Sequence, residues 1–251
     1  MNQLTIPLSI SCLSFLSLIS ISNHAGGNSA TKNPATFKSY HYSVADTCNN
    51  STINAADYIY DSLVLKQYGL SKQAWDYAFK GYEKLVAKKD ISNPDIITVC
   101  DFSLSSRRKR LLVVDIKNYK VLLNTYVAHG RKSGNEYANK FSNKANSHQS
   151  SIGFYVTGNP YYGEHGLALK IEGVDAGFND KAQKRNIVIH GSEYVGDQFL
   201  EHNRFMGRSF GCPAVPKQET ATIINTIKNG SCFFIYYPAK QYLKSSKILN
   251  G

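Results

Sequence analysis

Hydrophobic residues recur at helical spacing in two stripes between residues 54 and 89. The first stripe ends before Gly69, and the second follows Ser71, whose hydroxyl suits the N-terminus of a helix. The stripes comprise Tyr58, Leu63, Leu65 and Tyr68, then Trp75, Ala78, Phe79, Tyr82, Leu85 and Val86. We expect two helices in a small helical region, residues 53–94, that ends at Asn93-Pro94. Packing on a sheet edge is the ordinary use of such stripes, and recognition of a partner is the alternative.

From residue 95 the pattern changes to short apolar segments separated by turn formers such as Gly158-Asn159-Pro160. The expected strands are residues 96–104, 111–116, 120–128, 151–157, 167–171, 187–190 and 232–237. Residues 220–228 have a helical pattern that ends at Asn229-Gly230. We therefore expect a mainly β domain over residues 95–240, followed by a C-terminal tail, residues 241–251.

The N-terminal segment differs from the rest of the chain. Residues 1–24 contain no Lys, Arg, Asp or Glu, and residues 4–21 are apolar or Ser/Thr. This pattern predicts a signal peptide, residues 1–25, cleaved after Ala25, and an uncleaved membrane anchor is the alternative. Residues 26–52, rich in Ser, Thr, Asn and Gly, read as a flexible linker. The signal peptide leads us to expect a periplasmic, cell-envelope or secreted protein. No later segment has the ~20 apolar residues of a membrane span.

The formal net charge is +11, which suits an anionic polymer as partner. Nucleic acid is the alternative, supported mainly by the basic run Arg107-Arg108-Lys109-Arg110. That run lies between two expected strands, so we interpret it as a solvated hairpin tip and predict no nucleic-acid partner. Of the five cysteines, Cys232 lies in a buried-strand pattern, and a Cys48–Cys100 disulfide stays open.

Candidate chemistry centres on Cys212, in the run Gly207-Arg208-Ser209-Phe210-Gly211-Cys212-Pro213-Ala214-Val215. The apolar segment before His190-Gly191-Ser192 ends in the histidine, 22 positions upstream of the cysteine. A thiol reacts as the thiolate, so a nucleophilic cysteine needs a base or a positive neighbour. A strand-end histidine beside a Gly-Cys turn can supply that base, although such a histidine is more often structural.

These residues also resemble a known family. His190-Gly191 followed by Ser209-Phe210-Gly211-Cys212 is similar to the signature of the L,D-transpeptidases, and most closely to the divergent murein L,D-transpeptidase catalytic domain branch. The resemblance covers roughly residues 95–238. Further matching motifs are Val127-Ala128-His129-Gly130, Lys140-Phe141-Ser142-Asn143, residues 147–155 and Tyr161-Tyr162-Gly163-Glu164-His165-Gly166-Leu167.

The resemblance implies an L,D-transpeptidase-like β-sandwich and a site built on Cys212. His190 would be the general base, with the carbonyl of Gly191 orienting its ring. In the turn Ser209-Phe210-Gly211-Cys212, the amides of the last three residues are expected to hold the oxyanion. Phe210 stands where the main branch has His, and Ala214 where it has Asn or Arg, which affects substrate details.

Residues that would contact the substrate are less well defined by sequence. We consider Tyr162, His165, Ser192 and Arg208, where Arg208 either binds a substrate carboxylate or is a surface charge. His129 and His148 are further candidates to line the cleft. Because neither H-x-x-x-H nor C-x-x-C spacing occurs, we predict no metal and no cofactor.

The resemblance implies an exported cysteine L,D-transpeptidase acting on peptidoglycan stem peptides through a Cys212 thioester. It would form cross-links or exchange the terminal D-amino acid. An L,D-carboxypeptidase using the same acyl-enzyme, a non-catalytic cell-wall-binding protein and a nucleic-acid binder are the alternatives. The sequence does not distinguish transfer from hydrolysis and does not give the oligomeric state.

Overall fold

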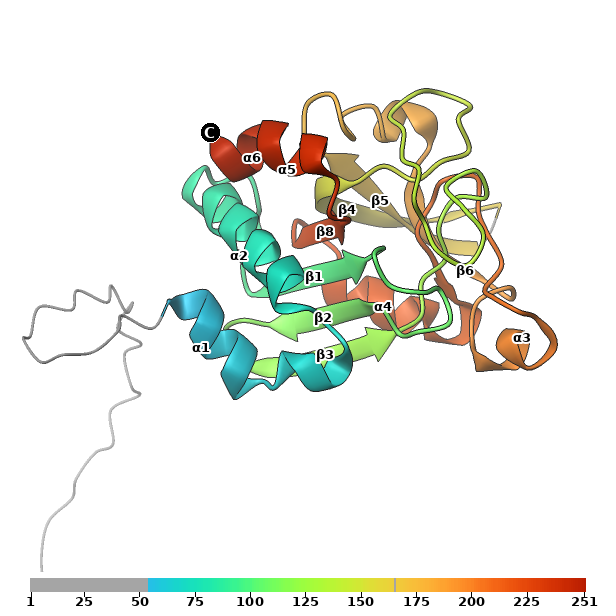
Figure 1. Cartoon of the computed structure of the whole chain (residues 1–251), viewed down its shortest axis with the longest axis horizontal. Coiled ribbons are helices and arrows are strands. Elements are labelled where there is room, and N and C mark those ends of the chain that lie inside the picture. Colours follow the sequence, from blue (N-terminus) through green and yellow to red (C-terminus); the bar gives the residue numbers. More distant parts are fainter. Residues whose placement is uncertain (1–53, 165) are drawn as a thin grey trace, which may run out of the picture. The chain divides into compact units, whose positions relative to one another are not determined.

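Two helices open the part of the chain that the structure describes (Figure 1). The computed structural model describes residues 54–164 and 166–251, so the expected signal peptide and linker, Cys12, Cys48 and His165 lie outside the described residues. Helices α1 (Ala55–Ser62) and α2 (Lys72–Ala87) flank the 3-10 helix η1 (Leu65–Tyr68). As predicted, Ser71 caps α2, and its hydroxyl accepts a hydrogen bond from the backbone N–H of Ala74 at 3.1 Å.

The second hydrophobic stripe faces the core as predicted, except that Val86 is exposed. The prediction for the first stripe is wrong at Tyr58 and Tyr68, which are exposed, whereas Ala56, Ile59 and Tyr60 are buried. Hydrogen bonds set this rotation of α1. The Trp75 indole N–H donates to the carbonyl of Ala56 at 2.7 Å, and the Tyr60 hydroxyl donates to the carbonyl of Leu70 at 2.8 Å.

One sheet of eight strands forms the body of the domain, in the order β3-β2-β1-β8-β4-β5-β6-β7. Its pairs are antiparallel except β1 with β8 and β6 with β7, which are parallel. This arrangement confirms the mainly β class with a small helical region before it. The strands are β1 (Ile96–Asp101), β2 (Leu111–Asp115), β3 (Lys120–Thr125), β4 (Gly153–Gly163), β5 (Gly166–Gly173), β6 (Val188–Ser192), β7 (Ala214–Pro216) and β8 (Cys232–Tyr236).

Several strands differ from the sequence prediction. Strand β4 continues through Gly158-Asn159-Pro160, where a turn was expected. At this irregular stretch the register of the pairing between β4 and β5 shifts, between Thr157 and Pro160. Strand β7 was not predicted, because three residues are too few to show an alternating pattern. Strand β1 also ends earlier than expected, at Asp101, whose carboxylate accepts from the backbone N–H of Ser103 at 3.0 Å.

The interpretation of the basic run as a solvated tip is wrong for its last residue. Arg107, Arg108 and Lys109 are exposed, but Arg110 is only 3% exposed. Its guanidinium lies 4.8 Å from the centre of the Phe102 ring and donates to the carbonyls of Val127 and Leu104. Arg110 is therefore part of the core that supports the region around His129.

The last residues do not form a separate tail, because they pack against the sheet. Helices α5 (Lys240–Ser245) and α6 (Lys247–Asn250) bury Tyr242, Ile248 and Leu249. Buried Asp175 accepts hydrogen bonds from the Tyr242 hydroxyl at 2.9 Å, from Ser246 and from the N–H of Phe154 in β4. Residues 54–164 and 166–251 fall within one compact unit.

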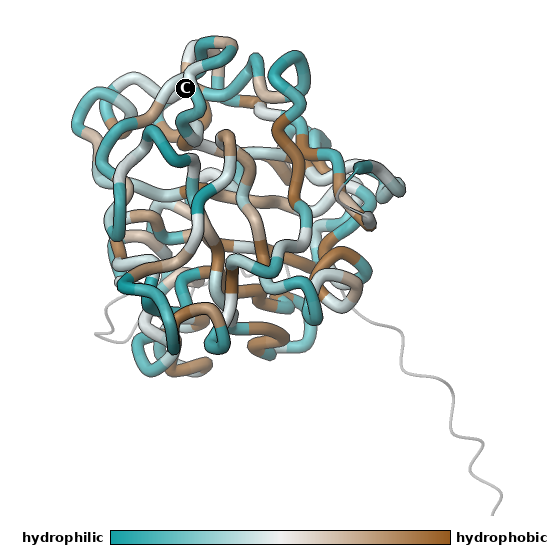
Figure 2. Tube along the Cα trace, turned by 90° about the vertical axis from the view of Figure 1, so that its right-hand side faces the viewer, coloured by the Kyte–Doolittle hydropathy of each residue, from teal (hydrophilic) through white to brown (hydrophobic). Residues whose placement is uncertain are grey.

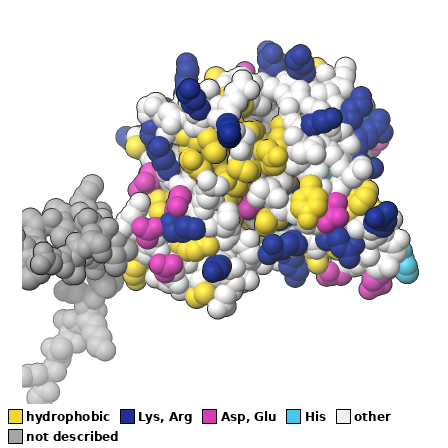
Figure 3. Space-filling model, viewed as in Figure 1, with side chains coloured by type: hydrophobic (Ala, Val, Ile, Leu, Met, Phe, Trp, Pro, Cys, Tyr) yellow, Lys and Arg dark blue, Asp and Glu magenta, His cyan; other side chains and the backbone are white. Residues whose placement is uncertain are grey.

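The remaining short elements lie around the cysteine turn and the sheet. They are η2 (Gln183–Arg185), α3 (Asp197–His202), η3 (Lys217–Glu219) and α4 (Thr220–Ile227). Figure 2 shows hydrophobic stretches along the inner strands and hydrophilic stretches in the outer loops, and Figure 3 shows Lys and Arg side chains over much of one face. Among residues 54–164 and 166–251, no helix has the length and apolar character needed to cross a bilayer.

Candidate active site

The parallel pairing of β6 with β7 brings His190 beside the segment that follows Cys212. His190 pairs with Ala214, and Gly191 pairs with Val215. Cys212 lies two residues before Ala214, so it is level with the part of β6 just before His190. Consistent with this, the Cys212 thiol is 3.6 Å from the carbonyl oxygen of Asn186. The register therefore places the cysteine segment beside the strand that carries His190.

The ring of His190 is held by its own strand. Its Nδ1 lies 3.1 Å from the carbonyl oxygen of Gly191. A carbonyl only accepts hydrogen bonds, so Nδ1 carries a proton that it donates to Gly191. His190 is 5% exposed. The hydrogen bond and the burial of the ring fix its orientation on the strand.

Small residues surround His190. It pairs with Ala168 on β5 and with Ala214 on β7, so neither neighbouring strand places a long side chain beside the ring. The next position must be glycine, since a Cβ on Gly191 would lie 2.1 Å from the Thr220 hydroxyl oxygen. Close packing of α4 thus fixes the strand end that carries the histidine.

A serine organises the cysteine turn internally. The Ser209 hydroxyl donates to the carbonyl of Cys212 at 2.6 Å and accepts from the backbone N–H of Gly211 at 3.0 Å. Gly211 has φ of +130°, and a Cβ there would approach the Gln149 carbonyl oxygen to 2.8 Å. Glycine is therefore required both for the backbone conformation and for the close approach of residues 149–150.

These bonds change the expected oxyanion donors. The N–H of Gly211 was expected to contribute, but it donates to Ser209 and is not available. Among the described residues, nothing accepts a hydrogen bond from the N–H of Phe210 or Cys212. Of the three expected donors, these two remain to meet developing negative charge near the thiol.

Arg185 is a site residue that sequence reasoning missed. Its guanidinium donates to the carbonyls of Ser142 and Gln149, both at 2.7 Å, and to the hydroxyls of Ser147 and Ser151. One of its terminal nitrogens lies 3.4 Å from where a Cβ of Gly211 would be, directly behind the cysteine turn. Nothing in the local pattern marks this arginine, because its partners are neutral and distant in sequence.

The charge of Arg185 acts on the nucleophile. Burial raises the pKa of the Cys212 thiol, whereas the backbone N–H of Val188 and the Arg185 guanidinium lower it. Burial is the largest of these effects, so the pKa lies above its ordinary value. Removal of the thiol proton therefore calls for a base.

A second buried pair supports the turn from the other side. Arg110 donates to Nδ1 of His129 at 2.9 Å, and the carbonyl of His129 accepts from the N–H of Ser209 at 3.0 Å. Burial and the Arg110 charge lower the pKa of His129 to about 3. His129 is thus neutral and has a structural role instead of lining the cleft.

The remaining predicted site residues are placed differently. Alternation along β4 puts Tyr161 on the face that carries His190, since both pair with Ala168, whereas Tyr162 faces the other way and is 84% exposed. Ser192 ends β6, and its hydroxyl accepts from the N–H of Tyr194 at 3.4 Å. Arg208 donates to Gly134 and Asn135. These bonds favour neither of the two expectations for this residue, a free surface charge or an open site for a substrate carboxylate.

Phe210 and His148 lie at the outer edge of the turn. Phe210 is 63% exposed, with the Arg131 guanidinium 4.6 Å from its ring centre and the His148 ring centre at 4.7 Å. The other described cysteines, Cys100 and Cys232, are buried in strands, as the sequence predicted for Cys232. Among the described residues, no three His, Cys, Asp or Glu side chains gather as metal ligands would.

The Arg185 charge predicts a measurable effect on the thiol. We expect Arg185→Met to move the midpoint of Cys212 alkylation by iodoacetamide to higher pH, because a positive neighbour of the thiolate is lost. Arg185→Lys, which keeps the charge, should retain most of the wild-type profile. Lys184→Met removes an adjacent exposed cation and is the matched control. Identical profiles for Arg185→Met and wild type would contradict the assignment.

The stability of the folded protein at acid pH should depend on the protonation of His129. The pKa is about 3 when folded and near 6.5 when unfolded, so between these values only the unfolded chain is protonated. The free energy of unfolding should then fall with decreasing pH below 6.5, by at most about 1.4 kcal/mol per pH unit from this residue. We expect urea unfolding of His129→Gln to be less pH-dependent there. Exposed His202→Gln is the control, and an unchanged slope in His129→Gln would count against this account.

Comparison with known proteins agrees with the geometry. The model of the L,D-transpeptidase catalytic domain family matches residues 66–236. Among solved structures, the chain resembles the L,D-transpeptidase of Mycobacterium smegmatis, with 11% identity over 57% of this chain and 59% of that chain and a TM-score of 0.35. It also resembles the helical cell shape determining protein of Campylobacter jejuni, with 15% identity over 56% and 46% of the chains and a TM-score of 0.36.

No curated protein sequence matches the chain. The M. smegmatis and C. jejuni structures are distant, and the chain spans less than two thirds of each. The family model is specific and covers more than half of this sequence. The chain therefore belongs to the L,D-transpeptidase catalytic domain family.

Proposed function

We propose that this protein is a peptidoglycan L,D-transpeptidase that works through a thioester on Cys212. Family membership supports the peptidoglycan substrate. The observation that carries the mechanism is the Nδ1 hydrogen bond of His190 to the Gly191 carbonyl, on a strand paired with the cysteine segment. The bond orients the ring on a strand beside the cysteine segment, and in this proposal Nε2 acts as the base.

The first half-reaction forms the thioester. Nε2 of His190 takes the thiol proton while the sulfur of Cys212 attacks the carbonyl carbon of the third stem residue, a diamino acid. The N–H groups of Phe210 and Cys212 hold the oxyanion. As the intermediate collapses, the C–N bond breaks, the imidazolium protonates the leaving nitrogen, and the terminal D-alanine departs.

The second half-reaction releases the acyl group. An amine from a neighbouring stem attacks the thioester carbonyl, His190 accepts its proton, and the sulfur leaves and recovers a proton. If the attacking amine belongs to a free D-amino acid, the terminal residue is exchanged instead. Water in the same position gives the L,D-carboxypeptidase reaction, so access of the acceptor decides which product forms.

Substitution of Cys212 and of His190 tests this proposal. We expect wild-type protein incubated with a stem tetrapeptide to release D-alanine and to carry a thioester on the Cys212 peptide, both detected by mass spectrometry. Cys212→Ala should show neither, and His190→Gln should lose roughly 10²–10⁴ in rate. Cys232→Val, at a buried strand position, is the matched control and should remain active. Full turnover by Cys212→Ala would refute the mechanism.

We further propose that residues 1–25 direct export, so that the enzyme acts in the periplasm or elsewhere in the cell envelope. The support is their lack of charged residues and their apolar run. N-terminal sequencing of protein isolated from its native host should find a mature chain that begins near Gly26. A cytosolic chain that begins at Met1 would overturn this proposal.

A further inference from the structure

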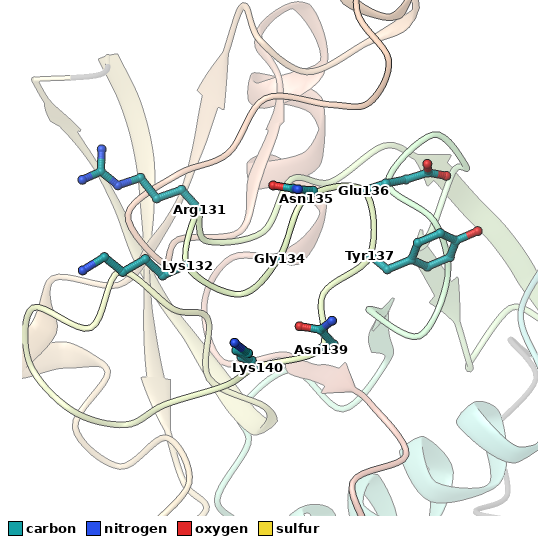
Figure 4. Close-up of a pocket in the computed structure, with 8 residues that line it drawn as sticks. All are labelled: Arg131, Lys132, Gly134, Asn135, Glu136, Tyr137, Asn139 and Lys140. Carbon is teal, nitrogen blue, oxygen red and sulfur yellow. The ribbon is translucent and has the colours of Figure 1, made fainter.

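A cationic pocket adjoins the cysteine turn. Residues 131–140 enclose a cavity of about 490 Å³, whose lining includes Arg131, Lys132 and Lys140 (Figure 4). Its edge is bound to the turn, since the N–H of Arg131 donates to the carbonyl of Ser209 at 2.8 Å and Gly130 forms a bridge with Ser209. The backbone of one lining residue is thus bonded to a residue three positions before Cys212.

The loop around this cavity is fixed from several directions. Buried Ser133 accepts from the N–H groups of Asn139 and Lys140 through its carbonyl, at 2.9 and 3.0 Å. Its hydroxyl accepts from the N–H of Ser150 at 2.9 Å. Arg208 spans to the loop through Gly134 and Asn135, at 3.1 and 2.6 Å. A ligand would therefore meet a preformed wall and would not have to order it.

The positive charges of the pocket are not neutralised. Among the described residues, no carboxylate lies within ion-pair distance of Arg131, Lys132 or Lys140. The one acid in the lining, Glu136, accepts a hydrogen bond from the Ser105 hydroxyl. Figure 4 shows Arg131 and Lys132 projecting side by side, outward from the ring of lining residues, with the Glu136 carboxylate on the opposite side. Three cations around one cavity favour a ligand with more than one negative charge.

We propose that this pocket binds carboxylate groups of the stem peptide whose carbonyl is presented to Cys212. The inference rests on the proposed function, which makes a carboxylate-bearing peptide the substrate. The planar guanidinium of Arg131 can bind a carboxylate through two parallel hydrogen bonds, and the lysines add charge without fixed geometry. The Phe210 ring beneath Arg131 holds the guanidinium at the edge of the turn.

A binding measurement on Cys212→Ala protein tests the pocket without turnover. Calorimetric titration would compare a stem tetrapeptide with free carboxylates and the same peptide with its carboxylates amidated. We expect the free acid to bind more tightly. Adding Lys132→Gln and Lys140→Gln together should weaken the free acid roughly three- to tenfold, the range for two partly solvated ion pairs, and leave the amidated peptide unchanged. High salt should reduce the difference.

The control is Lys80→Gln, an exposed lysine on α2, which should change neither affinity. Equal binding of the two peptides, equal losses for both in the double variant, or no binding of either would overturn the pocket assignment. The outcome is separate from that of the proposed function. Tight, charge-dependent binding together with no D-alanine release by wild-type protein would support the carboxylate-binding pocket and refute the proposed enzyme activity.

Discussion

The parallel register between β6 and β7 is the constraint on which the site depends. Parallel neighbours need a long crossover, because the chain must return to the same end of the sheet before it pairs again. Here that crossover is the segment between Ser192 and Ala214, and it contains α3 and the cysteine turn. A one-residue slip would move Cys212 relative to His190 and would place its side chain on the other face. The geometry of the pair is thus a property of the sheet.

Two arginines hold the crossover, and neither has a carboxylate partner among the described residues. Arg110 donates to backbone carbonyls and to His129, and Arg185 donates to the carbonyls and hydroxyls of residues 142–151. Burial lowers the pKa of Arg110 to about 10, and that of Arg185 also falls, yet both stay charged at neutral pH. A paired carboxylate would cancel their fields, whereas neutral acceptors satisfy the donors and leave positive potential around the turn.

The sequence predicted most of what depends on local pattern. Strand segments, the Ser71 cap and buried Cys232 all have signals within a few residues, and the family motifs added the contact between the Gly191 carbonyl and the His190 ring. Arg185 and Arg110 gave no such signal, because their partners lie far away in the chain. The engagement of the Gly211 N–H by Ser209 was likewise invisible, since a turn sequence does not show which of its amides are occupied. The rotation of α1 followed from tertiary hydrogen bonds of Trp75 and Tyr60 that override periodicity.

The raised pKa of Cys212 bears on how such a site can work. A preformed thiolate–imidazolium pair would need the thiol pKa to fall below that of the imidazole, and burial acts against this. In the proposed mechanism, His190 removes the proton as the carbon–sulfur bond forms. Negative charge then develops only in the transition state. Groups that stabilise this charge therefore lower the barrier more than groups that stabilise the resting state. Arg185 behind Gly211 and the N–H groups of Phe210 and Cys212 are placed to act on that transient charge.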